Sequence, residues 1–285
     1  MTICGIMLKK EREVFIKTNG RVTKIVEKWY KSLPFNRKYD EEFYKALDEI
    51  YIDEEWKIED YDKKCENGKQ NLLAYLYFLE DMKKRYLDLG IDESIFTDSA
   101  EDIVRWCDAW SETKGELYLG ELNWLTPVFM AKIIKLGRLQ FCFAQETHTI
   151  EKYGIEKGDT VLAIHIPAAG PLLLEDCKRS VDMAREFFPK IFPGTDYKCF
   201  TCHSWLLDPT HSEIMKPGSN ILAFQTMFDI VDKNVSDSLF GYVFRWKMTR
   251  AELENAECKS SFAKTVREAA LSGRKFYAGL GVIEK

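Results

Sequence analysis

The chain has 285 residues, of which 46% are hydrophobic and 31% charged, and its formal net charge is −5. This composition is typical of a folded globular protein with one large or two ordinary domains, and it excludes a disordered chain. The negative charge excludes a general affinity for nucleic acid or for an anionic membrane, so we expect neither partner.

The N-terminal residues 1–13, MTICGIMLKKERE, have no basic leader and no small-residue cleavage site. The longest apolar region, Val161 to Leu174, contains His165, Pro167 and Pro171 and is too short to span a bilayer. Eight cysteines are too few for a disulfide scaffold and indicate buried thiols in a reducing compartment. We therefore expect a cytoplasmic protein.

Apolar residues recur at helical spacing as far as about residue 117, which predicts a helical N-terminal domain over 1–117. The expected helices cover residues 22–33, 43–51 and 72–89, and a fourth begins with Ser99 as its N-cap. A polar loop is expected over 60–70, with its turn at Asn67-Gly68. This half offers no catalytic motif.

The second domain, 118–285, alternates helical and strand-like patterns, which predicts an α+β protein with a mixed α/β second domain. Strands are expected over 139–145, 160–167, 197–207, 221–231 and 239–248, with a terminal extended segment after residue 275. Helices are expected over 128–136, from Leu174 to a stop at Pro189, and over 262–271.

The stretch from Tyr197 to Pro209 concentrates reactive residue types. Cys199 to His203 matches the C-x-x-C-H haem-attachment pattern, but on a strand Cys199 and His203 face one way and Cys202 the other. The remaining cysteines offer no second pair for zinc, and a redox C-x-x-C normally sits at a helix N-terminus. We interpret these cysteines as buried strand thiols and expect no metal.

His203 and His165 stand at the ends of two predicted strands, where the active sites of open sheets gather. A neutral imidazole there could take a proton from an attacking amine, because its ordinary pKa lies near working pH. Glu146 ends a third strand and is a rival base. The alternative for each histidine is a structural role with a hydrogen bond to the backbone.

Two helix N-termini differ in their capacity to hold a phosphate. The helix that begins at Leu174 carries Glu175 and Asp176 in its first turn, and these carboxylates would repel an anion. The C-terminal helix has Ser260 or Ser261 as a cap and carries basic side chains in its first turns. Candidate phosphate contacts are Ser261, Lys264 and Arg267. An ordinary surface helix is the alternative.

Five short motifs follow one another in the second half: LGRLQF (136–141), HIP with G-P-L (165–172), S-x-x-x-A-x-x-F-F (180–188), CHSWLLDP (202–209) and SNILAFQ (219–225). Together they resemble bacterial GNAT-like N-acyltransferases that have a helical N-terminal domain and a GNAT-like C-terminal domain. The resemblance implies a central, mostly antiparallel sheet in the second domain.

The resemblance also implies an acyl-CoA-dependent transfer to a small-molecule amine, with acetyl-CoA as the expected donor. The amine attacks the thioester, His203 or His165 removes its proton, and Ser204 or Cys202 returns a proton to the leaving thiolate. Backbone amides hold the oxyanion and the CoA pyrophosphate. Gly170, in the Ala168–Pro171 loop, stands where the glycine-rich pyrophosphate loop is expected.

Two alternatives stand beside this hypothesis. The first is a cysteine-dependent hydrolase with Cys202 as nucleophile, which would need His165 as its base because His203 faces the other side of the strand. The second is a non-catalytic ligand-binding protein on the same fold, which the missing glutamine- or arginine-led glycine-rich loop favours.

Overall fold

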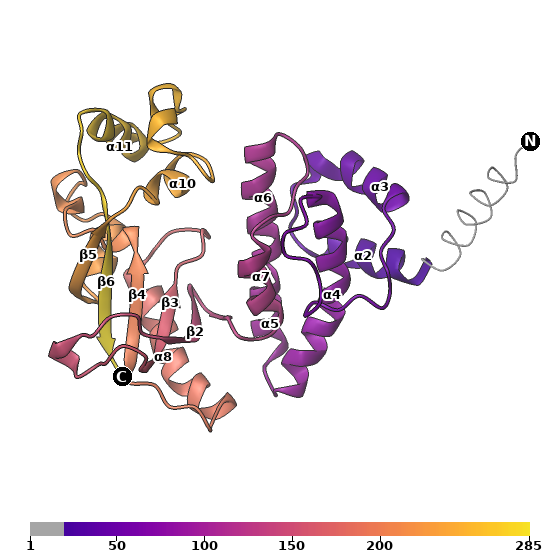
Figure 1. The fold of residues 1–285 in the computed structure, drawn as a ribbon, viewed down its shortest axis with the longest axis horizontal. Helices are drawn as coiled ribbons and strands as arrows, with labels where there is room; N and C mark the ends of the chain where they lie inside the picture. The colour runs from indigo at the N-terminus through magenta and orange to yellow at the C-terminus, as the bar shows by residue number, and fades with distance from the viewer. Residues whose placement is uncertain (1–19) are drawn as a thin grey trace, which may run out of the picture. The chain divides into compact units, whose positions relative to one another are not determined.

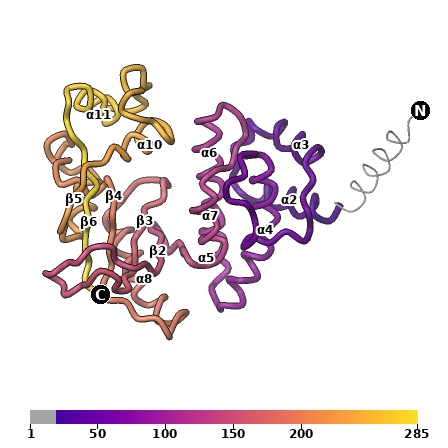
Figure 2. The backbone as a smooth tube through the Cα atoms, viewed as in Figure 1, coloured from indigo at the N-terminus to yellow at the C-terminus, as the bar shows by residue number. Residues whose placement is uncertain are grey.

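The computed structural model describes residues 20–285, and the chain falls into two compact units that meet between Ala131 and Lys132. The colours of Figure 2 separate the units, indigo to magenta for the first and pink to yellow for the second. The sequence places this boundary earlier, after residue 117.

The prediction about a leader concerns residues 1–13, which lie outside the described residues. No helix between residues 20 and 285 is both long and apolar enough to cross a bilayer.

The first unit is helical, as predicted. Its helices are α2 (Gly20–Ser32), α3 (Asp40–Glu49), α4 (Gly68–Asp88), α5 (Glu93–Ala100), α6 (Asp102–Lys114) and α7 (Leu122–Phe129), with a 3-10 turn η1 (Arg37–Tyr39). The long helix α4 is the centre of the unit, because its Leu72, Tyr75, Leu76 and Leu79 are fully buried. Helices α2, α3, α5 and α7 pack against it.

Two local predictions for this part of the chain are wrong, and the predicted polar loop 60–70 is three residues too long. The polar loop ends at Asn67, whose side chain accepts a hydrogen bond from the Gln70 amide and caps α4. Ser99 lies inside α5, whose N-cap is Asp92. No helix covers 128–136, because α7 carries Pro127 in its interior and ends at Phe129.

The second unit is built on a six-stranded sheet in the order β1-β2-β3-β4-β6-β5. The strands are β1 (Ile134–Leu136), β2 (Leu139–Gln145), β3 (Thr160–His165), β4 (Cys199–Ser204), β5 (Asp229–Val235) and β6 (Tyr277–Glu284). Neighbours pair antiparallel except β3 and β4, which run parallel. The predicted mostly antiparallel sheet is confirmed, and Figure 1 shows β4 between β3 and the yellow strand β6.

Helix α8 (Leu174–Ile191) covers one face of this sheet. Phe188 of α8 contacts Phe141 and Phe143 of β2, with ring centroids 6.4 and 5.1 Å apart. The predicted stop at Pro189 is wrong, because Pro189 lies within the last turn of α8. The opposite face is apolar at one end, where Ile150 and Ile155 of the β2–β3 loop pack against β3, β4 and β6.

Two predicted strands after β4 are wrong. Residues 221–231 form helix α9 (Asn220–Gln225) and only the start of β5, and residues 239–248 begin with helix α10 (Leu239–Val243). Helix α11 (Ser261–Leu271) and β6 are found where the sequence predicts them. Helices α10 and α11 share one apolar cluster with Phe276. Short 3-10 turns complete the unit: η2 (Glu151–Tyr153), η3 (Trp205–Leu207), η4 (His211–Glu213) and η5 (Arg250–Asn255).

Two glycines of β6 allow the chain to turn back over the sheet directly after β4. Gly279 pairs with Ser204 and Gly281 with Cys202. A Cβ atom on Gly279 would lie 2.2 Å from the Leu207 carbonyl oxygen, and one on Gly281 would lie 2.7 Å from Leu207 Cδ1. The position of η3 against β6 therefore requires glycine at both places.

We predict that Gly279→Ala lowers the free energy of unfolding by about 2–3 kcal/mol, because the new methyl group meets backbone that cannot move without breaking strand pairing. Urea denaturation followed by far-UV circular dichroism measures the change. Gly194→Ala is the matched control, since its Cβ atom meets nothing within 4 Å. Equal stability of the two variants would contradict this account of the turn.

Candidate functional site

The parallel strands β3 and β4 separate at their C-terminal ends. They pair at Leu162 with Phe200 and at Ala163 with Thr201, and no further pair joins them in the described chain. Each strand nevertheless continues, β3 paired to β2 as far as His165 and β4 paired to β6 as far as Ser204. We call the two separated ends, Ile164–His165 and Cys202–Ser204, the β3–β4 fork. Its facing backbone edges are free of strand partners, so their amides and carbonyls are available to a ligand.

The fork places the two predicted histidines on one face of the sheet. Paired residues of neighbouring strands point to the same side, and side chains alternate along each strand. His165 lies two residues beyond Ala163, and His203 two residues beyond Thr201, which are paired. Both imidazoles therefore project from the face opposite α8, one from each arm of the fork.

His165 is partly buried and pairs across the sheet with Gln140 of β2. Its Nε2 lies 3.3 Å from the Cys142 thiol sulfur. Burial lowers the pKa of His165 from 6.5 to about 4, because the surroundings disfavour the charged imidazolium. The ring is therefore neutral at pH 7 and a weak base, suited to hydrogen bonding rather than to proton abstraction.

His203 has a different environment, because its side chain is exposed. It is paired with Leu280 of β6 and is not enclosed by the helices on the other face. The ring of His203 is thus accessible from outside the protein, and its role in proton transfer stays a prediction.

The two predicted proton donors, Cys202 and Ser204, lie on the other face of β4, toward α8. Cys202 is 1% exposed, and burial raises the pKa of its thiol far above the usual range. The Ser204 hydroxyl oxygen accepts a hydrogen bond from the Leu206 amide and caps η3. The structure therefore gives Cys202 a packing role and Ser204 a capping role, and brings neither beside His203.

Glu146 is not brought to the fork. It follows the end of β2, which runs antiparallel to β3, so it lies at the start of β3 rather than at its end. The length of β3 separates it from His165, about 17 Å at 3.3 Å per residue. Its carboxylate is buried and accepts hydrogen bonds from the Thr147 and His148 amides, which order the loop after β2.

Gly170 belongs to the loop that follows β3. Arg138, which the sequence analysis does not identify, stabilises this loop by hydrogen bonds. Arg138, in the turn between β1 and β2, donates from Nη1 to the Pro167 carbonyl (2.9 Å), from Nε to that of Pro171 (3.0 Å) and from Nη2 to that of Gly170 (3.4 Å). Gly170 itself has a φ of +59° and open space at its Cβ position, so its conformation explains the glycine.

The predicted phosphate contacts start a helix on the β4 side of the fork. The N-cap of α11 is Ser260, whose side chain accepts from the Ala263 amide, and Ser261 is the first helical residue. Arg267 Nη1 donates a hydrogen bond to the Ala256 carbonyl oxygen. Lys264 Nζ lies 4.0 Å from Glu268 Oε1. Phe262 contacts His211, in the turn after β4. These contacts stabilise α11 and leave a phosphate role as a prediction.

Asp208 and His211 form a buried polar pair that fixes the turn after the fork. Asp208 accepts hydrogen bonds from the amides of Thr210 and Tyr277, and His211 Nε2 lies 2.9 Å from the Trp205 carbonyl oxygen. Burial lowers the pKa of His211 and so favours its neutral form. The pair ties η3 to β6 and thereby holds the β4 arm of the fork.

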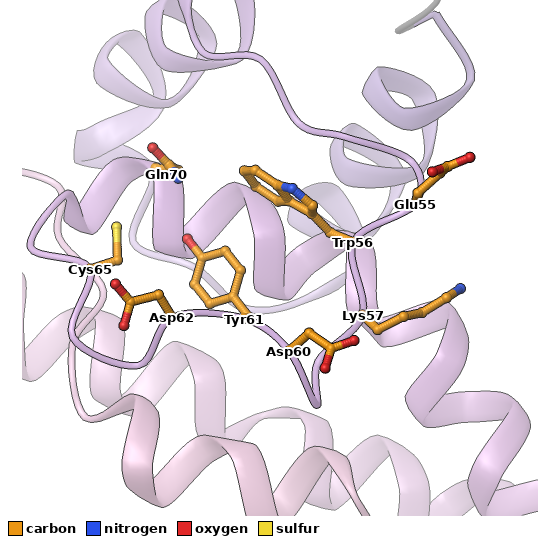
Figure 3. Close-up of a pocket in the computed structure, with 8 residues that line it drawn as sticks. All are labelled: Glu55, Trp56, Lys57, Asp60, Tyr61, Asp62, Cys65 and Gln70. Atoms are coloured by element: carbon orange, nitrogen blue, oxygen red, sulfur yellow. The ribbon is translucent and has the colours of Figure 1, made fainter.

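The helical unit contains a separate open pocket of about 390 Å³, shown in Figure 3. The rings of Trp56 and Tyr61 lie beside each other with centroids 5.5 Å apart, whereas Glu55 and Lys57 point away. The lining residues are Glu55, Trp56, Lys57, Asp60, Tyr61, Asp62, Cys65 and Gln70. None of the predicted site residues lines this pocket.

Over residues 20–285, no group of three His, Cys, Asp or Glu side chains is arranged to hold a metal ion.

The chain is similar to known acyltransferases in both of its units. A family model for the GNAT-like C-terminal domain matches residues 133–283, and one for the N-acyltransferase N-terminal domain matches residues 20–131. No protein of curated function is similar enough to count as a match.

Several solved structures share the fold. An acyltransferase in complex with decanoyl-CoA has a TM-score of 0.65 and 26% identity over 75% of this chain and 65% of its own. An acyltransferase in complex with decanoyl-CoA and teicoplanin has a TM-score of 0.67 and 22% identity over 75% of this chain and 66% of its own. This chain thus spans slightly less than two thirds of the length of either structure.

We predict that acidification from pH 6.5 to 4 destabilises the protein partly through His165. In this window the unfolded chain binds a proton that the folded chain excludes, so the free energy of unfolding falls as the pH falls. The contribution of His165 is about 2 kcal/mol, less than the full shift because the ring is only partly buried.

Urea denaturation at a series of pH values measures this effect, and the His165→Gln variant is expected to show a shallower loss of stability than the wild type. Gln145→Met, an exchange of uncharged side chains at an exposed position, is the control and should keep the wild-type slope. A His165→Gln profile parallel to that of the wild type would show that burial of this ring is not coupled to folding.

Proposed function

Because the chain belongs to the family of proteins with a GNAT-like C-terminal domain, we propose that it transfers an acyl group from a CoA thioester to an amine. The observation that carries the proposal is the β3–β4 fork, with an imidazole on each arm facing the same side of the sheet. The unpaired edges can hold an extended thioester arm, and the exposed ring of His203 can take the proton of an amine that approaches it.

In the proposed reaction the amine nitrogen attacks the thioester carbonyl carbon and forms the new C–N bond. Backbone amides at the open edges of the fork stabilise the developing oxyanion. His203 accepts the proton that the nitrogen loses, the C–S bond breaks, and CoA leaves as a thiolate that is protonated to the thiol. The products are an amide and free CoA, with no covalent enzyme intermediate.

Solved relatives support a CoA thioester as the donor. The structure with 26% identity is bound to decanoyl-CoA, and a mutant acyltransferase of this fold is bound to octanoyl-CoA. Acetyl-CoA, the donor expected from the sequence, is the shorter alternative. The two donors differ in apolar surface, because burial of a decanoyl chain contributes far more to binding than burial of an acetyl group.

The acceptor remains the unidentified amine predicted from the sequence. One of the solved acyltransferases is in complex with decanoyl-CoA and teicoplanin, which supports testing a glycopeptide beside simple amines as the acceptor. The cysteine-dependent alternative is disfavoured by geometry. The Cys202 thiol is buried on the face away from both imidazoles, so no base in the fork can activate it.

We predict that His203→Gln lowers kcat by about 10²- to 10⁴-fold and leaves the dissociation constant of the donor within a few-fold of the wild type, because it removes the base and not the binding edges. Calorimetric titration with acetyl-, octanoyl- and decanoyl-CoA measures binding, and release of the CoA thiol in the presence of an amine panel measures turnover.

Cys202→Ala is the control, and we expect it to retain turnover because the thiol takes no part in the reaction. Absence of heat with every donor would refute the proposed function. Loss of turnover in Cys202→Ala with unchanged donor binding would instead favour the cysteine-dependent mechanism.

A further inference from the structure

Gln140 is a buried polar side chain whose amide nitrogen has no partner in the structure. The side chain is 2% exposed, and its Nε2 forms no hydrogen bond with any described residue. A buried donor left without an acceptor destabilises a fold, and native proteins keep few of them. Where one occurs beside a candidate active site, a ligand atom is a natural partner.

The position of Gln140 connects it to the fork. It lies on β2 directly opposite His165, so the two side chains project from the same face of the sheet. Cys142, the next residue of β2 on this face, places its sulfur 3.3 Å from His165 Nε2. The far end of the same face is filled by the apolar cluster around Val161 and Cys199. At the polar end of this face, Gln140 lies between His165 of β3 and the buried Lys135 of β1, each of which pairs directly with it, and His203 lies on the other arm of the fork.

The strand order brings the amine acceptor, and not the acyl-CoA donor, within reach of Gln140. A thioester held between the edges of β3 and β4 is divided from Gln140 by the backbone of β3, because β2 lies on the other side of that strand. The amine must approach from the face that carries His203, and the rest of the acceptor then lies over this face. Gln140 is placed to meet the acceptor beyond its reacting nitrogen.

We propose that Gln140 determines acceptor specificity by donating a hydrogen bond from Nε2 to an oxygen of the amine substrate. This inference rests on the proposed function and names the substrate class, an amine that carries a carbonyl or carboxylate oxygen close to its nitrogen. An apolar amine leaves the buried Nε2 without a partner, which is how a polar site rejects an analogue that lacks the matching group.

The test uses the full chain with the Gln140→Met substitution, which keeps the volume of the side chain and removes the donor. Transfer from decanoyl-CoA and from acetyl-CoA is followed by release of the CoA thiol, with glycinamide and ethylamine as matched acceptors. We expect the ratio of kcat/KM for glycinamide to that for ethylamine to fall about tenfold in the variant, the effect of one hydrogen bond. The KM of the donor should not change.

Gln145→Met is the matched control, because Gln145 is exposed on the same strand and its amide already bonds to Thr160 Oγ1 at 3.1 Å. It should keep the wild-type ratio. A Gln140→Met ratio within twofold of the wild type would overturn the proposal, as would a wild type that turns over other amines but acylates glycinamide no better than ethylamine.

A second measurement does not require turnover. Without substrate, Gln140→Met should raise the melting temperature by a few degrees, since it removes a buried donor that has no partner. A lower melting temperature would mean that the amide stabilises the fold and would overturn the proposal. Failure of the wild type to bind any donor would refute the proposed function, whereas the melting temperature still decides whether Gln140 has an internal partner.

Discussion

The loss of pairing between β3 and β4 is the constraint on which the rest of the second unit depends. A parallel pair that stops after two positions leaves backbone groups on both edges without strand partners, and such groups need a ligand or water. Each arm is held in place from its outer side. β2 holds β3 as far as His165, and β6 holds β4 as far as Ser204. Arg138 fixes the loop after the first arm, and Asp208 fixes the turn after the second.

The two imidazoles of the fork show how position sets chemistry. His165 lies against β2, and burial brings its pKa to about 4, so it stays neutral and acts through hydrogen bonds. His203 lies on β4, which β3 separates from β2, and its ring is exposed. A pair of equivalent histidines in the sequence thus becomes a fixed polar group and an accessible one.

Elements with a clear periodic pattern of apolar residues are predicted correctly from the sequence. Strands β2, β3 and β4 and helices α8 and α11 were found because their apolar residues alternate or recur with a clear period. The prediction failed at Ile221–Val231, where a short apolar run resembles a strand but Ser219 caps helix α9. Strand β5 was missed as such because it is a largely exposed edge strand with no alternating apolar pattern.

The candidate site was predicted only in part. His165 and His203 could be named because each ends a strand, yet that they share a face depends on the parallel pairing of β3 with β4, which joins segments far apart in the sequence. Glu146 also ends a strand and is therefore predicted as a base, but β2 runs antiparallel to β3 and ends at the opposite end of the sheet. Gln140 carries no local signal, because its burial depends on neighbours that the sequence does not identify.

Amide hydrogen exchange of the full chain with and without decanoyl-CoA tests the role of the fork most directly. We expect the donor to protect peptides containing Ile164–His165 and Cys202–Ser204, while the β1–β2 hairpin, which lies at the edge of the sheet and away from the fork, changes little. Protection elsewhere in the chain, with both arms of the fork exchanging at their unliganded rates, would contradict the claim that the open edges of β3 and β4 bind the thioester.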